Sequence, residues 1–452
     1  MTERIARLSV SIACLTLAAV IGVVSAVSPA ALQVGLLAAI GIAGALLMIQ
    51  SPAWVFAVFW IGYSLKSTVF AGGSAAEGIF YPLYGIMLLN SALLLCRRLS
   101  NPLRTRPLLI FLITAGLFLA IAAFALGRPD TNSEDYSFVA YQRVFIYFMG
   151  AIGAVQFWAD ARSRIFLKTV SVMSLALAMW VIVTAQGSGF QYRGGTGINE
   201  NYLAEIVAVG LLPILAAILA EGRRIGSRMA LSATLLIGVY ALLLLASRGT
   251  GIAFGVSALF GLALQIRRLS VFLIAAMVAG AAVLVLPQLP GSESIILRFH
   301  SSDVYTLNDR TAIWGAVSTG ILDGNFGQLL FGHGVNSAVT LVRNQFPAYT
   351  STHNSYLQIL YEFGAAGLIA FLGCHLVPLF GLMRRRDATS VASASMLMFL
   401  MMSSLTGTES DNFQYWLVVA FAAATSCQPS PQRRTLRARI VASDACIRPS
   451  IA

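Results

Sequence analysis

The chain has 452 residues, of which 58% are hydrophobic and only 11% are charged. Soluble globular domains are about 45–50% apolar and about 25% charged, so these figures exclude a soluble enzyme, a disordered chain and a disulfide-stapled domain. The mean hydropathy of +0.80 instead predicts an all-α integral membrane protein. The formal net charge of +12, from 30 Lys and Arg against 18 Asp and Glu, then reports which loops face the cytoplasm.

Apolar runs of about 17–25 residues, long enough to cross a bilayer as helices, follow one another along most of the chain. They predict about 12–14 transmembrane helices. Lys66 weakens the third run, and the last two are short enough to form a re-entrant pair instead of two spans. The runs lie at 8–27, 31–49, 52–71, 79–96, 107–126, 139–158, 166–185, 201–220, 229–247, 249–266, 269–287, 354–382, 388–406 and 411–427.

Basic residues gather in alternate connections between these runs. With a cytoplasmic N-terminus, the cytoplasmic loops and tails hold 22 basic and 5 acidic residues, and all other positions hold 8 basic and 13 acidic residues. Because positive charge favours the cytoplasmic side, both termini are predicted there, and the +12 is not expected to bind nucleic acid. A basic start before an apolar run also fits a signal peptide, but its removal would not improve this charge pattern, so the first run is interpreted as an anchor.

The sequence carries none of the common cofactor motifs. It has no CxxC, no HExxH and no glycine-rich phosphate loop, so neither a metal nor another cofactor is expected. The cysteines all fall within predicted spans or on the cytoplasmic side, which leaves no pair for an extracytoplasmic disulfide. They are Cys14, Cys96, Cys374, Cys427 and Cys446.

The longest connection outside the membrane covers 288–353, about 66 residues, and ordered loops of this length are usually functional. Two shorter loops, 127–138 and 186–200, lie on the same side. Within the long loop, Asn308 or Asp309 is positioned to cap one helix and Asn336 or Ser337 another. We therefore expect a large helical extracytoplasmic loop.

A few arginines break the charge partition and lie on the outer side. Arg143 falls within the sixth span, Arg248 at the outer end of the ninth, and Arg193 in the loop before the eighth. Ionisable groups at membrane depth indicate function by default. The alternative is an interfacial side chain or an ion pair with Glu205 or Glu362.

Three histidines lie in the long loop, and His353 directly precedes the twelfth span. The free N–H groups at a helix start favour an anion, and a neutral imidazole is suited to accept a proton from a hydroxyl. The alternative is a solvated loop histidine or a helix cap. Glu362 follows two turns into the same helix, where a carboxylate is expected to be paired.

Several short motifs occur in a characteristic order and topology, and together they resemble the O-antigen ligase and polymerase family. The resemblance covers about 193–372. The motifs are Ser247-Arg248-Gly249, Asp309-Arg310-Thr311-Ala312-Ile313-Trp314, Phe331-Gly332-His333-Gly334, and His353-Asn354-Ser355-Tyr356-Leu357 with Glu362, Gly364, Gly367 and Leu368.

The resemblance implies a GT-C-type membrane glycosyltransferase that needs no metal. In that family a glycan moves from undecaprenyl diphosphate to a sugar hydroxyl of lipid A–core or of a second lipid-linked glycan. The reaction takes place at the periplasmic face of the bacterial inner membrane. Donor and acceptor glycolipid are the expected partners.

The resemblance also assigns roles to residues. His353 matches the proposed general base, and Arg248 and Arg193 match arginines expected to hold the diphosphate. Arg310 matches a further arginine of the family, and with Arg143 and Asn354 it completes the expected substrate-binding set. Asn201, His333 and Glu362 are expected to support the site. An Asn-Pro-Asn-like element before the eighth span is replaced by 197–202, which changes the loop that carries Arg193.

These expectations divide the chain into four parts. Residues 1–192 are predicted to form N-terminal transmembrane helices, and 193–382 the ligase-like core with the loop 288–353. Residues 383–427 are predicted to form C-terminal transmembrane helices, and 428–452 a cytoplasmic tail.

Several functions stay open. Ligase and polymerase are not separated by the sequence. A transporter or flippase of lipid-linked glycans also fits many spans, although no internal repeat is evident. An assembly subunit would not require Arg193, Arg248 and His353 at one face.

Overall fold

The structure is a computed structural model. It describes residue 60 and residues 106–126, 134–159, 164–187, 200–220, 224–265, 310–349, 351–408 and 412–428. Over this part of the chain all regular structure is helical, which confirms the predicted all-α fold. Arg193, the first four predicted spans apart from Trp60, the eleventh span and the C-terminal tail lie outside the described residues.

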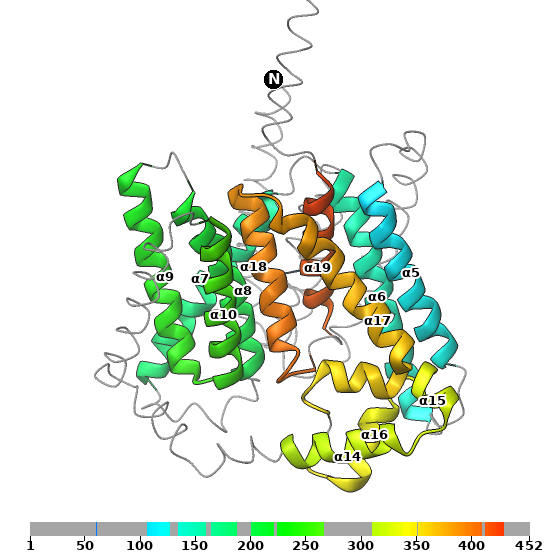
Figure 1. The fold of residues 1–452 in the computed structure, drawn as a ribbon. Helices are drawn as coiled ribbons and strands as arrows, with labels where there is room; N and C mark the ends of the chain where they lie inside the picture. Colours follow the sequence, from blue (N-terminus) through cyan, green and yellow to red (C-terminus); the bar gives the residue numbers. More distant parts are fainter. Residues whose placement is uncertain are drawn as a thin grey trace, which may run out of the picture.

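The helices form an antiparallel bundle with a small helical layer at one end (Figure 1). Among the described helices, five are long and apolar enough to cross a membrane, namely α5, α7, α8, α9 and α17, and α18 and α19 are shorter apolar helices. The bounds are α5 Arg106–Leu126, α6 Glu134–Ala159, α7 Arg164–Gly187, α8 Glu200–Leu219, α9 Ile225–Leu245, α10 Arg248–Gln265, α14 Arg310–Leu322, α15 Phe326–Phe331, α16 Ser337–Gln345, α17 Ser355–Met383, α18 Ala388–Ser403 and α19 Phe413–Cys427.

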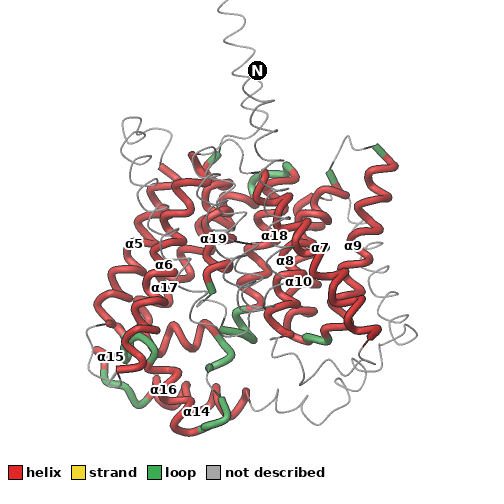
Figure 2. The backbone as a smooth tube through the Cα atoms, turned by 180° about the vertical axis from the view of Figure 1, so that it is seen from behind, coloured by secondary structure: helices red, strands yellow, loops and turns green. Residues whose placement is uncertain are grey.

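The bundle core is built from aromatic rings and small residues. Phe118 of α5 lies between Tyr147 of α6, Phe363 of α17 and Trp416 of α19, with ring centroids 5.1–5.8 Å apart. A Cβ at Gly150 would lie 2.8 Å from Cβ of Trp416, so only glycine lets α6 approach α19 this closely. The tube in Figure 2 shows these helices side by side from behind. In this core, α17 packs against α5, α18 and α19.

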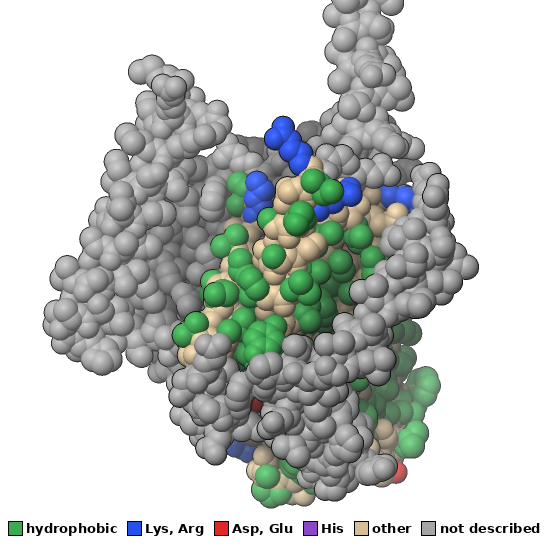
Figure 3. Space-filling model, turned by 90° about the vertical axis from the view of Figure 1, so that its left-hand side faces the viewer, with side chains coloured by type: hydrophobic (Ala, Val, Ile, Leu, Met, Phe, Trp, Pro, Cys, Tyr) green, Lys and Arg blue, Asp and Glu red, His purple; other side chains and the backbone are tan. Residues whose placement is uncertain are grey.

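Basic residues of several connections gather at one end of the bundle. Figure 3 shows apolar side chains along the body, with most of the visible Lys and Arg side chains at the top of the view and fewer at the lower end. The basic residues at the starts of α7 and α9 and at the end of α17 belong to this end, and they are Lys168, Arg224, Arg228, Arg384, Arg385 and Arg386. In the described part of the chain, the connections that the charge pattern predicts to be cytoplasmic therefore lie at the same end of the bundle.

Helix α17 is not the single straight span predicted for 354–382. Gly364 has φ 68° and ψ −171°, which breaks the helix into a first segment, 355–363, and a second segment, 365–383. The break frees two carbonyls, and these accept hydrogen bonds from the N–H groups of His333 (to Tyr361, 2.9 Å) and Gly334 (to Glu362, 3.0 Å). The first segment packs beside α14–α16, and only the second runs through the bundle (Figure 1).

The motif Phe331-Gly332-His333-Gly334 packs against the backbone of this kink. A Cβ at Gly332 would lie 2.2 Å from the Glu362 carbonyl oxygen, and one at Gly364 would lie 2.4 Å from the Leu330 carbonyl. Both glycines have positive φ, a backbone region in which glycine carries no Cβ penalty. The segment around Gly332 and the segment around Gly364 are therefore in direct backbone contact.

Helices α14 and α16 close a second, smaller apolar core over the first segment of α17. Its buried members are Ile313, Val317, Ala338, Val342 and Tyr361. The prediction of short helices in the long loop is confirmed for 310–345. Asn336 does precede α16, but its side chain makes no capping bond to that helix.

Candidate active site at the start of α17

His353 lies in a short strap, residues 351–354, that enters the first segment of α17. Its backbone has φ 50°, an uncommon conformation for a non-glycine residue. The residues on both sides are buried, whereas His353 is half-buried. The imidazole of His353 is therefore partly accessible, whereas the residues on either side of it are packed into the protein.

Hydrogen bonds from three directions fix this strap. Asn354 caps α17, because its Oδ1 accepts from the Leu357 N–H at 3.0 Å. The Thr352 hydroxyl lies 3.0 Å from the carbonyl oxygen of Asn354 and 3.2 Å from Oε1 of Gln358. From α14, the indole N–H of Trp314 donates to the Thr352 carbonyl at 3.1 Å. Asn354, expected to contact substrate, thus has its side-chain oxygen engaged in the cap.

The electrostatics keep His353 neutral. Burial, and to a smaller extent the positive charge of Arg310, lower the pKa of its imidazole from 6.5 to about 4. No described residue hydrogen-bonds an imidazole nitrogen, and the nearest ring, Tyr349, lies edge-on at 6.3 Å. An imidazole that is neutral and has no hydrogen bond to a described residue can accept a proton, as a general base must.

Arg310 is brought to this site by α14. It is the first residue of the helix, one turn before Trp314. Since Trp314 is bonded to the strap, Arg310 lies on the side of α14 that meets His353. Its effect on the His353 pKa places a guanidinium within electrostatic range of the base.

The Ser247-Arg248-Gly249 motif forms the reversal between α9 and α10. Ala246 ends α9 in the left-handed conformation, and the Ser247 hydroxyl donates to Thr250 Oγ1 at 2.9 Å in the first turn of α10. Arg248 is thereby the first residue of α10, where free N–H groups and the helix dipole add to its positive charge. Such a helix start is suited to a phosphate group.

A turn at 403–408 contacts both the start of α17 and the start of α10. The Ser355 N–H lies 2.9 Å from the carbonyls of Ser404 and Gly407, and its hydroxyl donates to Gly407 at 3.0 Å. On the other side, a Cβ at Gly249 would lie 2.4 Å from Thr406 Oγ1, so α10 begins directly against this turn. Arg248 and His353, more than a hundred residues apart in sequence, are therefore positioned by one common element.

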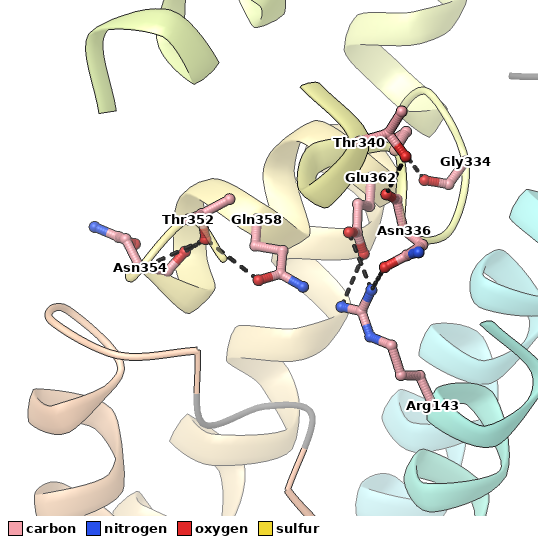
Figure 4. A network of polar contacts seen from close by, with 9 residues as sticks. Arg143, Gly334, Asn336, Thr340, Thr352, Asn354, Gln358 and Glu362 are labelled. Carbon is pink, nitrogen blue, oxygen red and sulfur yellow. Dashed lines mark hydrogen bonds and ion pairs between the residues drawn. The ribbon is translucent and has the colours of Figure 1, made fainter. Parts of the chain in front are cut away.

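Arg143 lies in a different cluster, at the far end of the first segment of α17 (Figure 4). Its Nη1 donates to Glu362 Oε1 at 3.1 Å and to Asn336 Oδ1 at 3.4 Å. Its Nη2 lies 3.0 Å from Glu362 Oε2, an ion pair without hydrogen-bond geometry. Both charged side chains are buried. Of the two predicted alternatives for Arg143, the structure shows the ion pair with Glu362.

The remaining expected site residues lie on elements other than the strap that carries His353. His333 stacks on Tyr361 with ring centroids 4.3 Å apart, at the kink. Asn201 is exposed in the first turn of α8. Within the described ranges, no group of three or more His, Cys, Asp or Glu residues is arranged to hold a metal ion.

Sequence reasoning missed the turn at 403–408, Trp314 as a donor to the strap, and Asn336 as a partner of Arg143. Ser404, Thr406 and Gly407 are small residues at the end of an apolar run and carry no motif. Asn336 is predicted from the sequence only as a cap. A side chain that bonds to a helix 193 residues earlier in the chain leaves no local signal.

Comparison with curated proteins returned no significant match. A family comparison did return one, since residues 233–372 match the family described as O-antigen ligase. The matched range contains α9 from its ninth residue, α10, α14–α16 and α17 through the kink, and thus Arg248, Arg310, His353 and Glu362. Arg143 and the 403–408 turn fall outside it. The resemblance to O-antigen ligases, membrane glycosyltransferases, is therefore confirmed over residues 233–372.

Proposed function

We propose that this protein transfers a glycan from undecaprenyl diphosphate to a sugar hydroxyl of an acceptor glycolipid, at the periplasmic face of the inner membrane. The observation that carries the proposal is the neutral, half-buried His353 beside Arg310, held against the same turn as the Arg248 helix start. The O-antigen ligase match supports the reaction class.

In the proposed step, an imidazole nitrogen of His353 takes the proton of the acceptor hydroxyl as its oxygen attacks the anomeric carbon. The bond between that carbon and the diphosphate oxygen breaks, and its electron pair leaves with the diphosphate. Guanidinium groups stabilise the negative charge that develops there, because they offer paired N–H donors to phosphate oxygens. Arg248 and Arg310 are assigned this role, with Arg193 as a third contributor.

Positive charge near His353 serves both halves of this step. It lowers the pKa of the imidazole, which keeps the base unprotonated before the reaction at the cost of some basicity, and it attracts the anionic donor. After transfer, the proton on His353 is returned to solvent or to the departing diphosphate. The residues present supply base and charge without a metal, so the reaction is expected to proceed in EDTA.

The test is surface polysaccharide in cells that carry His353→Ala or Arg248→Ala, with Arg343→Ala as the control because Arg343 is an exposed arginine of α16. Both site variants should accumulate in the membrane and lose the product, whereas the control should make it normally. Normal product from both site variants would overturn the assignment.

The nature of the lost product separates the remaining functions. Loss of glycan from lipid A–core indicates a ligase, and shortened chains indicate a polymerase. If the protein is a transporter, the inactive variants would leave lipid-linked glycan on the cytoplasmic face of the membrane. Transfer by purified protein in vesicles, with lipid-linked donor added to the outside, would exclude that last function.

A further inference from the structure

Helix α15 and the end of α14 present a group of large apolar side chains, which we call the apolar corner: Leu322, Phe326, Leu329 and Phe331. Leu322 and Phe326 are 78% and 80% exposed, and the other two are each 39% exposed. None of the residues of α15 is buried. Exposed apolar surface of this kind marks a contact with another molecule or with a membrane.

The apolar corner continues an apolar belt on two membrane-spanning helices. The Phe331 ring lies 6.0 Å from that of Phe124, which is near the end of α5. Phe124 is 59% exposed, and Leu117 on α5 and Ile369 on α17 also point outward. Because α5 and α17 are packed on each other and are apolar enough to span a membrane, their outward side chains would face acyl chains in a bilayer. The corner extends that surface beyond the end of α5.

The polar groups of the turn limit how deep the corner reaches. Asp323 is exposed between Leu322 and Phe326, and a carboxylate in the hydrocarbon centre is costly. The backbone of α15 is satisfied locally by a capping box, in which Asn325 and Gln328 exchange bonds of 2.9 and 3.0 Å. An apolar face with its polar groups satisfied at one edge matches a helix in the boundary between headgroups and acyl chains.

We propose that the apolar corner inserts into the adjacent membrane leaflet, with phospholipid acyl chains as its partner. Helix α14 then links the bilayer to the site, since its last residue is Leu322 and its first is Arg310. Its 13 helical residues span about 20 Å, so the corner anchors the helix that carries Arg310 about 20 Å from this membrane contact. This last consequence rests on the proposed function, whereas the insertion itself does not.

Spin-label accessibility in lipid nanodiscs tests the insertion. Full-length protein without its accessible cysteines would carry a label at Phe326→Cys, at Leu322→Cys or, as the control, at Asn344→Cys, an exposed polar site on α16. Labels at 326 and 322 should be relaxed by oxygen and protected from a water-soluble nickel chelate. The label at 344 should show the reverse.

Two outcomes would overturn the proposal. Equal access of the nickel chelate to positions 326 and 344 would place the corner in water. Protection of position 326 from both reagents would place protein over it, either a second copy or another segment of this chain. Neither outcome depends on activity, so failure here is distinguishable from failure of the proposed glycosyl transfer.

Discussion

The two ends of the first segment of α17 carry the same kinds of residue in opposite states. At the start, His353 is half-buried and Arg310 acts on it through charge without a hydrogen bond between them. At the kink, Arg143 and Glu362 are fully buried and bound to each other and to Asn336. Nine residues, about 13 Å of helix, separate the two ends.

The difference shows that burial and partners, more than residue type, decide what an ionisable group does. A buried charge needs a hydrogen-bonded partner, and once Glu362 supplies it Arg143 joins α6 to α17. An imidazole without a hydrogen-bonding partner among the described residues is available to a substrate. We therefore interpret the start of the segment as the reactive end and the kink as the structural end.

The largest expected effect is at the reactive end. His353→Ala should lower the turnover of glycan transfer by about 10²–10⁴, the usual contribution of a general base, and leave the thermal unfolding midpoint nearly unchanged because the side chain is half-buried. Steady-state transfer and unfolding would be measured on the same preparation. A large drop in the unfolding midpoint would assign His353 to structure instead.

The structural end should behave in the opposite way. Arg143→Ala leaves Glu362 as a buried unpaired carboxylate, so the free energy of unfolding should fall by about 3–5 kcal/mol. Replacing both partners with apolar residues, as Arg143→Met with Glu362→Leu, should recover most of that stability. Activity would be measured in the double variant. A stable but inactive double variant would return Arg143 to the substrate-binding group.

The kink itself can be tested through Gly364→Ala. A Cβ there meets the Leu330 backbone at 2.4 Å, at a φ of 68°, so roughly 2–5 kcal/mol of stability should be lost. Gly315→Ala on α14 is the matched control, since no heavy atom lies within 4 Å of the position that its added methyl group would take. Equal unfolding midpoints for the two variants would contradict the backbone contact between the two glycine motifs.

The smallest effect is a shift in pH dependence. Because the His353 pKa is lowered to about 4, activity should fall only as the pH drops through about 4, below which the base is protonated. Arg310→Gln removes a positive charge and should raise the pKa, which moves this acidic limb to higher pH. A limb that stays in place would show that burial alone sets the pKa.

The same lowered pKa affects folding. Between about pH 6.5 and 4, the His353 imidazole is protonated in the unfolded chain but not in the folded protein. The free energy of unfolding therefore decreases as the pH falls through that window. His353→Gln should abolish this component of the pH dependence of unfolding.

Patterns in the sequence are sufficient to predict a helical membrane protein and its resemblance to the O-antigen ligase family over residues 233–372. Continuous apolar runs predict helices whatever their neighbours are, and the positions of Arg and Lys divide the connections into two sets. Those patterns are local, so they can be read without a fold. The motifs of Arg248, Arg310 and His353 can likewise be read because each is contiguous, and the matched family covers them.

Packing determines which of these residues act together. The pairing of Arg143 with Glu362 spans 219 residues, and the turn that holds both helix starts follows α18, outside every motif. The break at Gly364 is hidden in the sequence because 354–382 reads as one apolar run, and only the backbone of Leu330 shows why glycine is required there. Long-range contacts of this kind depend on tertiary structure, and they leave no periodic pattern in a single sequence.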